Sequence, residues 1–284
     1  MTGSRAAGAF WSAETSGTAR AGRGSGRPPA WSLAVLVVSI VYFFLPLLGT
    51  AAFAFSTGKV FTLEYLAQGL TDPDALGSIL LSAGFAVSTT VVAVVLVAPS
   101  AYLVELRLPG LRPVLDFVTI LPFVIPPIIL TLGLEEVYGI RGIFNLVGSP
   151  VLLVGGYFAL TLPFVYRAID NALRAVDVRT LTEAAESLGS GPFRTFLRVI
   201  VPSISTGILS AALLAFTTIM GEFTLASLMG YATFPVMLNN TYASASREAA
   251  SLVLVSFMIT WLSVLALALV ARRSPTARQV ATAR

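Results

Sequence analysis

Residues 181–202, LTEAAESLGSGPFRTFLRVIVP, form a polar, helix-prone stretch inside a chain that is otherwise strongly apolar. Thr180 and Glu183 fit the capping box T-x-x-E, which predicts a helix start at this point. The residues at positions i, i+3, i+4 and i+7 of that helix are apolar, namely Leu181, Ala184, Ala185 and Leu188. A helix of two turns is unstable alone, so it must pack either on its own chain or on a partner.

The second half of the stretch predicts a sharp turn followed by another helix. Gly189 occupies the place where a left-handed C-terminal cap is expected. Ser190 or Gly191 can cap the next helix, with Pro192 at its first position. Its apolar side is expected to consist of Phe193, Phe196, Leu197 and Ile200, and Pro202 is expected to end it.

Outside this stretch, the composition predicts a membrane protein. The chain has 284 residues, of which 56% are hydrophobic and 11% are charged, whereas soluble domains carry about 25% charged residues. Apolar runs long enough to span a bilayer occur at residues 32–55, 78–104, 115–138, 151–169, 203–230 and 251–271. The sequence therefore predicts an all-α, polytopic fold with six transmembrane helices.

The basic residues predict the orientation of these spans. An even number of spans places both termini on the same side, together with the 107–112 loop and the 170–202 loop. All of the 18 basic residues except Lys59, Arg141 and Arg247 fall on that side. Because Lys and Arg concentrate in cytoplasmic segments, both termini are expected in the cytoplasm.

The expected organisation is a disordered cytoplasmic N-tail at 1–30, a transmembrane domain at 31–272 that includes the polar loop at 178–202, and a cytoplasmic C-tail at 273–284. A cleaved signal peptide is the alternative for the first 55 residues. Its apolar core would, however, exceed the usual length of roughly 7–15 residues. The loop after the fifth span is expected to be solvated and to contain Asn239, Asn240 and Tyr242.

Several chemical functions are excluded by what the sequence lacks. It contains no Cys and no His, which excludes thiol and imidazole chemistry and the usual zinc ligands. Lys59 is the single lysine, and Phe53 and Val60 depart from the pattern G-x-x-x-x-G-K-[ST], so the chain has no P-loop. We expect no catalytic residue, no metal site, no cofactor and no nucleic-acid partner.

The spacing within the opening stretch resembles the EAA loop of ABC importer permeases, E-A-A-x3-G-x9-I-x-L-P. Glu183, Ala184, Ala185, Gly189 and Pro202 match it, while Val199 and Val201 replace the usual Ile and Leu. Three further strings resemble the same family: Pro99-Ser100-Ala101-Tyr102, Leu121-Pro122-Phe123-Val124-Ile125-Pro126-Pro127 and Gly221-Glu222-Phe223. They are most similar to permeases for polyamines, ferric iron, thiamine, phosphonates, sulfate or molybdate, with a lean toward polyamines.

This resemblance implies a type I, MetI-like importer fold in the bacterial inner membrane. It also implies that the chain works with two ABC ATPase subunits, a second permease, homologous or identical, and an extracytoplasmic substrate-binding protein. The first short helix of the EAA loop would dock on an ATPase subunit, with Glu183 facing a basic residue there. The alternative functions are a secondary transporter or channel that acts alone, and an intramembrane enzyme.

Glu222 is the best candidate for a residue on the translocation path. An ionisable side chain inside a membrane segment is a functional candidate by default, and Thr218 and Phe223 lie beside Glu222 in the sequence. Glu222 can face a cationic solute or a gate, or it can satisfy backbone groups near Gly221. We favour a structural or gating role. Pro122, Pro126 and Pro127 are expected to kink the third span near its cytoplasmic entry.

Overall fold

The computed structural model describes residues 30–57, 60–138, 146 and 148–273. The predicted N-tail and C-tail therefore lie almost wholly outside the described residues. The contacts of the chain divide it into two units, residues 1–48 and residues 49–284. In the first unit, the described residues form the beginning of the apolar helix α1 (Ala30–Phe55), which contains Pro46. The second unit holds all the other elements.

Helices make up nearly all of the described chain, as predicted. After α1 come α2 (Glu64–Thr71), α3 (Pro73–Arg107), η1 (Pro109–Leu111), α4 (Arg112–Val124), α5 (Pro127–Tyr138), α6 (Pro150–Arg174), α7 (Val178–Ser187), α8 (Pro192–Thr195), the π-helical turn η2 (Phe196–Ile200), α9 (Val201–Ser203), α10 (Ser205–Met220), α11 (Thr224–Leu228), α12 (Phe234–Ser244) and α13 (Ser246–Arg273). The strands β1 (Ser56–Thr57) and β2 (Val60–Phe61) pair in an antiparallel hairpin.

The six predicted spans all fall on helices, but not all of them are continuous. Among the described residues, α1, α3 and α6 are each long and apolar enough to cross a bilayer. The 28-residue helix α13 contains the predicted sixth span. The third predicted span is instead broken into α4 and α5, with a bend of 103° between them. The chain also bends by 77° just before α10.

Prolines explain the broken third span. Pro126 and Pro127 have no backbone N–H, so the i→i−4 hydrogen bonds of a continuous helix cannot form there. The break lies between a 13-residue helix and a 12-residue helix. It is therefore near the middle of the segment, and the expectation of a kink near the cytoplasmic entry was wrong. Pro122 lies inside α4 without interrupting it.

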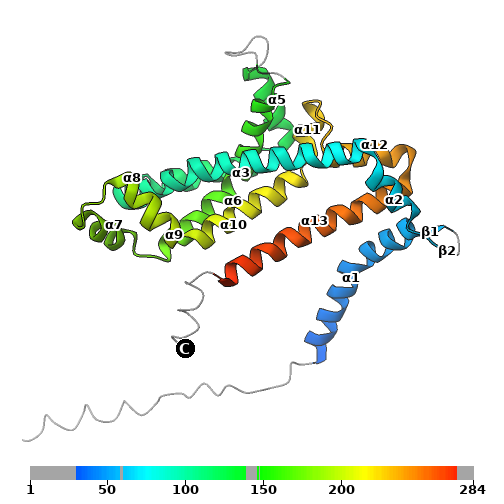
Figure 1. Cartoon of the computed structure of the whole chain (residues 1–284), viewed down its shortest axis with the longest axis horizontal. Coiled ribbons are helices and arrows are strands. Elements are labelled where there is room, and N and C mark those ends of the chain that lie inside the picture. Colours follow the sequence, from blue (N-terminus) through cyan, green and yellow to red (C-terminus); the bar gives the residue numbers. More distant parts are fainter. Residues whose placement is uncertain (1–29, 58–59, 139–145, 147, 274–284) are drawn as a thin grey trace, which may run out of the picture. The chain divides into compact units, whose positions relative to one another are not determined.

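Three helices form the core of the second unit. In Figure 1, α3, α6 and α10 lie side by side, with α7 and α8 at one end of the group and α2 and α12 at the other. The contact between α6 and α10 is especially close at Gly207, because a Cβ added there would overlap the Cβ of Ala172 and meet the backbone oxygen of Ala168. Small residues of this kind allow membrane helices to approach closely.

The segment after the fifth span is more ordered than a solvated loop. Asn239, Asn240 and Tyr242 lie on α12. The backbone N–H of Phe234 at its start donates to the Ser82 hydroxyl of α3 over 2.8 Å. Phe234 is fully buried, so this helix is anchored in the core at its first residue.

Candidate functional site

The first helix of the EAA loop, α7, is capped by a residue upstream of the predicted one. The Asp177 carboxylate accepts hydrogen bonds from the Thr180 backbone N–H over 3.1 Å and from the Thr180 hydroxyl over 2.7 Å. These bonds, led by the one from the hydroxyl, lower the pKa of Asp177. The prediction that Thr180 caps the helix was therefore wrong. Asp is at least as good an N-cap residue as Thr, and here Asp177, three residues upstream of Thr180, forms the cap.

The buried face of α7 is also rotated from the predicted one. Val178, Thr182 and Ala185 are buried, whereas Ala184 is exposed and Leu188 is 89% exposed. Thr182 accounts for this rotation, because its side chain points inward and its hydroxyl donates a hydrogen bond to the Val178 carbonyl of the same helix. The hydroxyl oxygens of Thr182 and Tyr102, which is on α3, lie 3.2 Å apart. Glu183 is exposed beside Ala184. The face that was predicted to pack is thus partly free.

The turn after α7 follows the prediction for Gly189. Its φ is +81°, in the left-handed region that favours glycine. The Gly189 N–H donates to the Glu186 carbonyl over 2.9 Å, and the Ser190 N–H donates to the Ala185 carbonyl over 3.0 Å. This pair of bonds is a Schellman motif. It ends α7 sharply and fixes the direction in which the chain leaves it.

The second helix of the loop begins as predicted and ends later. Gly191 is its N-cap and Pro192 its first residue. Pro202, expected to end the helix, instead lies in α9, and the helical path continues to Ser203. The π-helical turn at Phe196–Ile200 ends two residues before Pro202. In a regular α-helix the ring of Pro202 would clash with the backbone carbonyl four residues earlier, and the wider π-helical turn makes room for it.

The exposed side of the loop is apolar. Phe193 is 74% exposed and Leu197 is 46% exposed, in addition to Leu188. Phe196, by contrast, lies with its ring centroid 5.2 Å from that of Tyr102, and Ile200 is fully buried. The predicted apolar side of the second helix is therefore divided between the core and the surface.

The candidate path residues come together at one cavity. It has a volume of about 510 Å³ and lies at the break between α4 and α5. The lining residues are Pro122–Pro127 from that break, Leu160 and Phe164 from α6, Thr218 from α10, and Gly221, Glu222, Phe223 and Thr224 from the end of α10 onward. Thr218, Glu222 and Phe223 thus share a wall with the prolines of the third span.

Glu222 lies between two helices, so the fifth predicted span is interrupted there. Its carboxylate accepts hydrogen bonds from the Thr224 N–H over 2.7 Å and from the Leu225 N–H over 3.1 Å. These are N–H groups at the start of α11 that have no helical partner. The Tyr157 hydroxyl lies near the same carboxylate but outside hydrogen-bonding geometry. The arrangement agrees with the expectation that Glu222 satisfies backbone groups near Gly221, and it leaves the carboxylate at the cavity wall.

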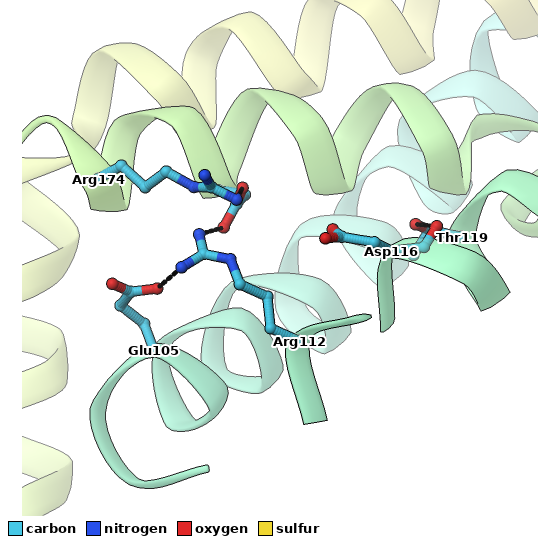
Figure 2. Close-up of polar contacts among 6 residues, drawn as sticks. Glu105, Arg112, Asp116, Thr119 and Arg174 are labelled. Atoms are coloured by element: carbon cyan, nitrogen blue, oxygen red, sulfur yellow. Dashed lines mark hydrogen bonds and ion pairs between the residues drawn. The ribbon is translucent and has the colours of Figure 1, made fainter. Parts of the chain in front are cut away.

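The structure also contains a polar cluster that the sequence analysis missed. As Figure 2 shows, the Arg112 guanidinium lies between Glu105 and a second carboxylate, which belongs to Asp170. The distances are 2.7 Å from Arg112 Nη1 to Glu105 Oε2 and 2.6 Å from Nη2 to Asp170 Oδ1. The second Asp170 oxygen pairs with Arg174 over 2.9 Å. Because 58 positions separate Arg112 from Asp170, no local pattern could have indicated this pair.

Comparison with known proteins identifies the family of the chain. Residues 108–279 match the family of binding-protein-dependent transport system inner membrane components. The spermidine/putrescine transport system permease protein PotB of Salmonella typhimurium is 30% identical over 222 residues, which is 69% of this chain and 77% of that protein. PotB of Haemophilus influenzae is matched over 54% of its length. The molybdenum transport system permease protein ModB of Azotobacter vinelandii is 32% identical over 165 residues, which is 55% of this chain and 73% of that protein.

Solved structures support the same fold. A chain of a bacterial ABC transporter for the acidic polysaccharide alginate has a TM-score of 0.60 at 13% identity, and the match covers 86% of this chain and 96% of that one. A chain of the MetNI methionine ABC transporter has a TM-score of 0.51 at 19% identity, covering 71% and 98%. The chain is thus a permease subunit of an ABC importer with a type I, MetI-like fold, a multi-pass protein of the inner membrane, and it belongs to the family of binding-protein-dependent transport system inner membrane components.

Proposed function

We propose that this permease is driven by a separate ATPase that docks on the exposed side of its EAA loop. Glu183, Ala184 and Leu188 are free on α7, and Phe193 is free just after the turn. Exposed apolar side chains gathered around a charged residue are typical of a protein interface. The absence of a P-loop from the chain agrees with ATP hydrolysis in another subunit. The family description itself implies a binding protein as a further partner.

The proposed cargo is a small cationic solute of the polyamine class. The observation that carries this proposal is the charge of the cavity at the break between α4 and α5: among the described residues that line it, Glu222 is the one ionisable residue, and none is Lys or Arg. A carboxylate attracts an ammonium group. The aromatic side chains of Phe123, Phe164 and Phe223 can add cation–π contacts. The PotB relatives are named for spermidine and putrescine transport.

An oxyanion is the second candidate, because the ModB relatives are named for molybdenum transport. An anion that passed this cavity would meet the Glu222 carboxylate with no cation among the described lining residues to offset it, which is unfavourable.

In either case we propose that the chain contributes half of the path and pairs with a second permease, homologous or identical. Both termini are proposed to be cytoplasmic.

Uptake into liposomes tests the cargo. The complex, purified with its ATPase subunits and supplied with its binding protein, would be given radiolabelled spermidine or molybdate. We expect spermidine uptake, and we expect Glu222→Gln to reduce it on the order of tenfold through the lost charge. Glutamine can still accept the hydrogen bonds at the start of α11. Thr218→Val is the matched control, since Thr218 lines the same cavity without a charge. Molybdate uptake without spermidine uptake would reverse the assignment, and unchanged uptake with unchanged ATP hydrolysis would remove Glu222 from the path.

A further inference from the structure

Arg112 joins three helices at the end of the molecule where the EAA loop lies. It is the first residue of α4, and it binds Glu105 in the last turn of α3 and Asp170 in the last two turns of α6. The Asp170 side chain is 12% exposed and that of Arg112 25% exposed. A planar guanidinium with separate donors can bridge two carboxylates in a way that lysine cannot. The contact therefore fixes the start of α4 against both neighbours.

The partners of Arg112 are themselves tied to α7. On α3, Tyr102 lies one turn before Glu105, and its hydroxyl meets the Thr182 hydroxyl of α7. Both of these side chains are buried. On α6, Arg174 is the last residue, and the N-cap of α7, Asp177, follows three positions later. Both helices that hold Arg112 through their carboxylates are thus connected to α7.

The other end of α4 forms part of the cavity wall. With 13 residues and a rise of about 1.5 Å per residue, α4 extends roughly 18 Å from Arg112 to Val124. Val124 and the following Pro126 line the same cavity as Glu222. One unbroken helix thus has the ion cluster at its start and the wall of the proposed path at its end.

The cluster also has room for a rearrangement. A second cavity of about 320 Å³ adjoins it, lined among others by Asp116, Arg167, Asp170 and Arg174. The Arg112 Nε is buried and has no hydrogen-bond partner in the described part of the chain. Asp116 lies one turn along α4 and lines this cavity beside the Tyr166 hydroxyl of α6, and it forms no ion pair with any described residue. A further carboxylate in the adjoining cavity gives the cluster room to rearrange without leaving a buried charge isolated.

We infer that Arg112 is a positioning residue for transport: it clamps α4 to α3 and α6, so that movement of the EAA loop reaches the cavity wall. This inference rests on the proposed function, because the movement is supplied by the ATPase. The other end of α4 is separated from α5 by the proline break, where the two helices are bent by 103°, so α4 is not held there as part of one continuous helix.

The absence of cysteine from the chain allows a direct test by spin labelling. Leu121→Cys on α4 and Val137→Cys on α5, on either side of the proline break, would be labelled in the complex purified with its ATPase subunits; both positions are exposed and neither lines the cavity at that break. The label-to-label distance would be measured without nucleotide and with ATP and vanadate. We expect a shift in the otherwise unchanged chain and its loss in Arg112→Gln, while ATP hydrolysis continues.

Spermidine uptake per ATP hydrolysed gives a second readout. We expect a fall on the order of tenfold in Arg112→Gln and about threefold in Glu105→Gln, which removes one arm of the bridge. If Arg112→Gln fails to fold, Glu105→Gln carries the test. Arg167→Gln is the matched control: it removes the same charge from the cavity that adjoins the cluster, yet Arg167 forms no ion pair among the described residues.

The possible failures are distinguishable. If both variants keep the nucleotide-dependent shift and the normal ratio of uptake to hydrolysis, Arg112 only stabilises the fold and the inference is wrong. A merely structural role would lower the melting temperature without changing the shift in the folded protein. If no ATPase purifies with the chain, the proposed function itself fails, and this inference fails with it.

Discussion

At the scale of single residues, the backbone chemistry of the EAA loop is what the sequence indicates most reliably. Gly189 and Pro192 lie where their φ preferences place them, because a left-handed turn and a first helical position are decided locally. The cap was missed because Asp177 and Thr180 are both acceptable and lie in the same turn. Choosing between them requires knowledge of which side of the helix is buried.

Gly189 gives the first testable prediction at this scale. Gly189→Leu forces a Cβ into a left-handed conformation and should distort the exit from α7, so that uptake no longer follows ATP hydrolysis. Gly189→Asn is the control, because Asn tolerates this conformation better than other L-residues. The measurement is the ratio of substrate uptake to ATP hydrolysis in liposomes.

Glu183 gives a second prediction. Glu183→Ala should lower the same ratio of uptake to hydrolysis by removing the exposed carboxylate. Wild-type ratios for both Gly189→Leu and Glu183→Ala would leave the loop with a packing role alone.

Asp177 gives a prediction on pH. Because hydrogen bonds from Thr180 lower its pKa, the cap stabilises α7 at any pH above the ordinary carboxyl value and is lost only as the pH falls through the lowered value. Hydrogen exchange of the α7 amides, corrected for the intrinsic rate, should therefore show equal protection at pH 5 and pH 8. Asp177→Ala should reduce that protection and Asp177→Asn should largely preserve it. A loss of protection between pH 8 and pH 5 would contradict this assignment.

At the scale of elements, apolar length predicted a helical segment at each of the six proposed spans, but the breaks were predicted only in part. Prolines mark the break between α4 and α5 in the sequence, whereas its angle depends on the helices packed around it. The pairing of Arg112 with Asp170 could not be predicted from the sequence for a different reason. The pair depends on how α3, α4 and α6 pack against one another, and neither the spacing of the residues nor the composition contains that information.

The packing of α6 on α10 can be tested at Gly207. Gly207→Val should separate the two helices, since the added Cβ has no room beside Ala172, at a cost of about 1–3 kcal/mol. Thermal unfolding in detergent, followed by circular dichroism, should show a lower midpoint. Gly155→Ala in α6 is the control, because a Cβ at Gly155 meets nothing within 4 Å. Equal midpoints for the two variants would mean that the contact at Gly207 adds nothing.

At the scale of the whole molecule, the distribution of basic residues makes a prediction that the fold alone does not. All but three of the 18 Lys and Arg residues are assigned to one side, which should face the cytoplasm. Green fluorescent protein fused after Arg284 should therefore fluoresce, since it matures in the cytoplasm but not after export in an unfolded state. Alkaline phosphatase fused after Phe61 should be active, since it requires the opposite side. The reverse pattern would invert the topology and would place the EAA loop out of reach of any ATPase.

The break between α4 and α5 has a mechanical consequence. In a bilayer, an ordinary helix can bend only by giving up backbone hydrogen bonds that no water replaces. At Pro126 and Pro127 the two donors are missing by covalent structure, so those bonds do not exist to be given up. A change of angle there breaks fewer backbone hydrogen bonds than it would in a continuous helix. Side-chain packing therefore has a larger share in setting the angle, which makes this point of the chain a hinge whose resting position is tuned by packing.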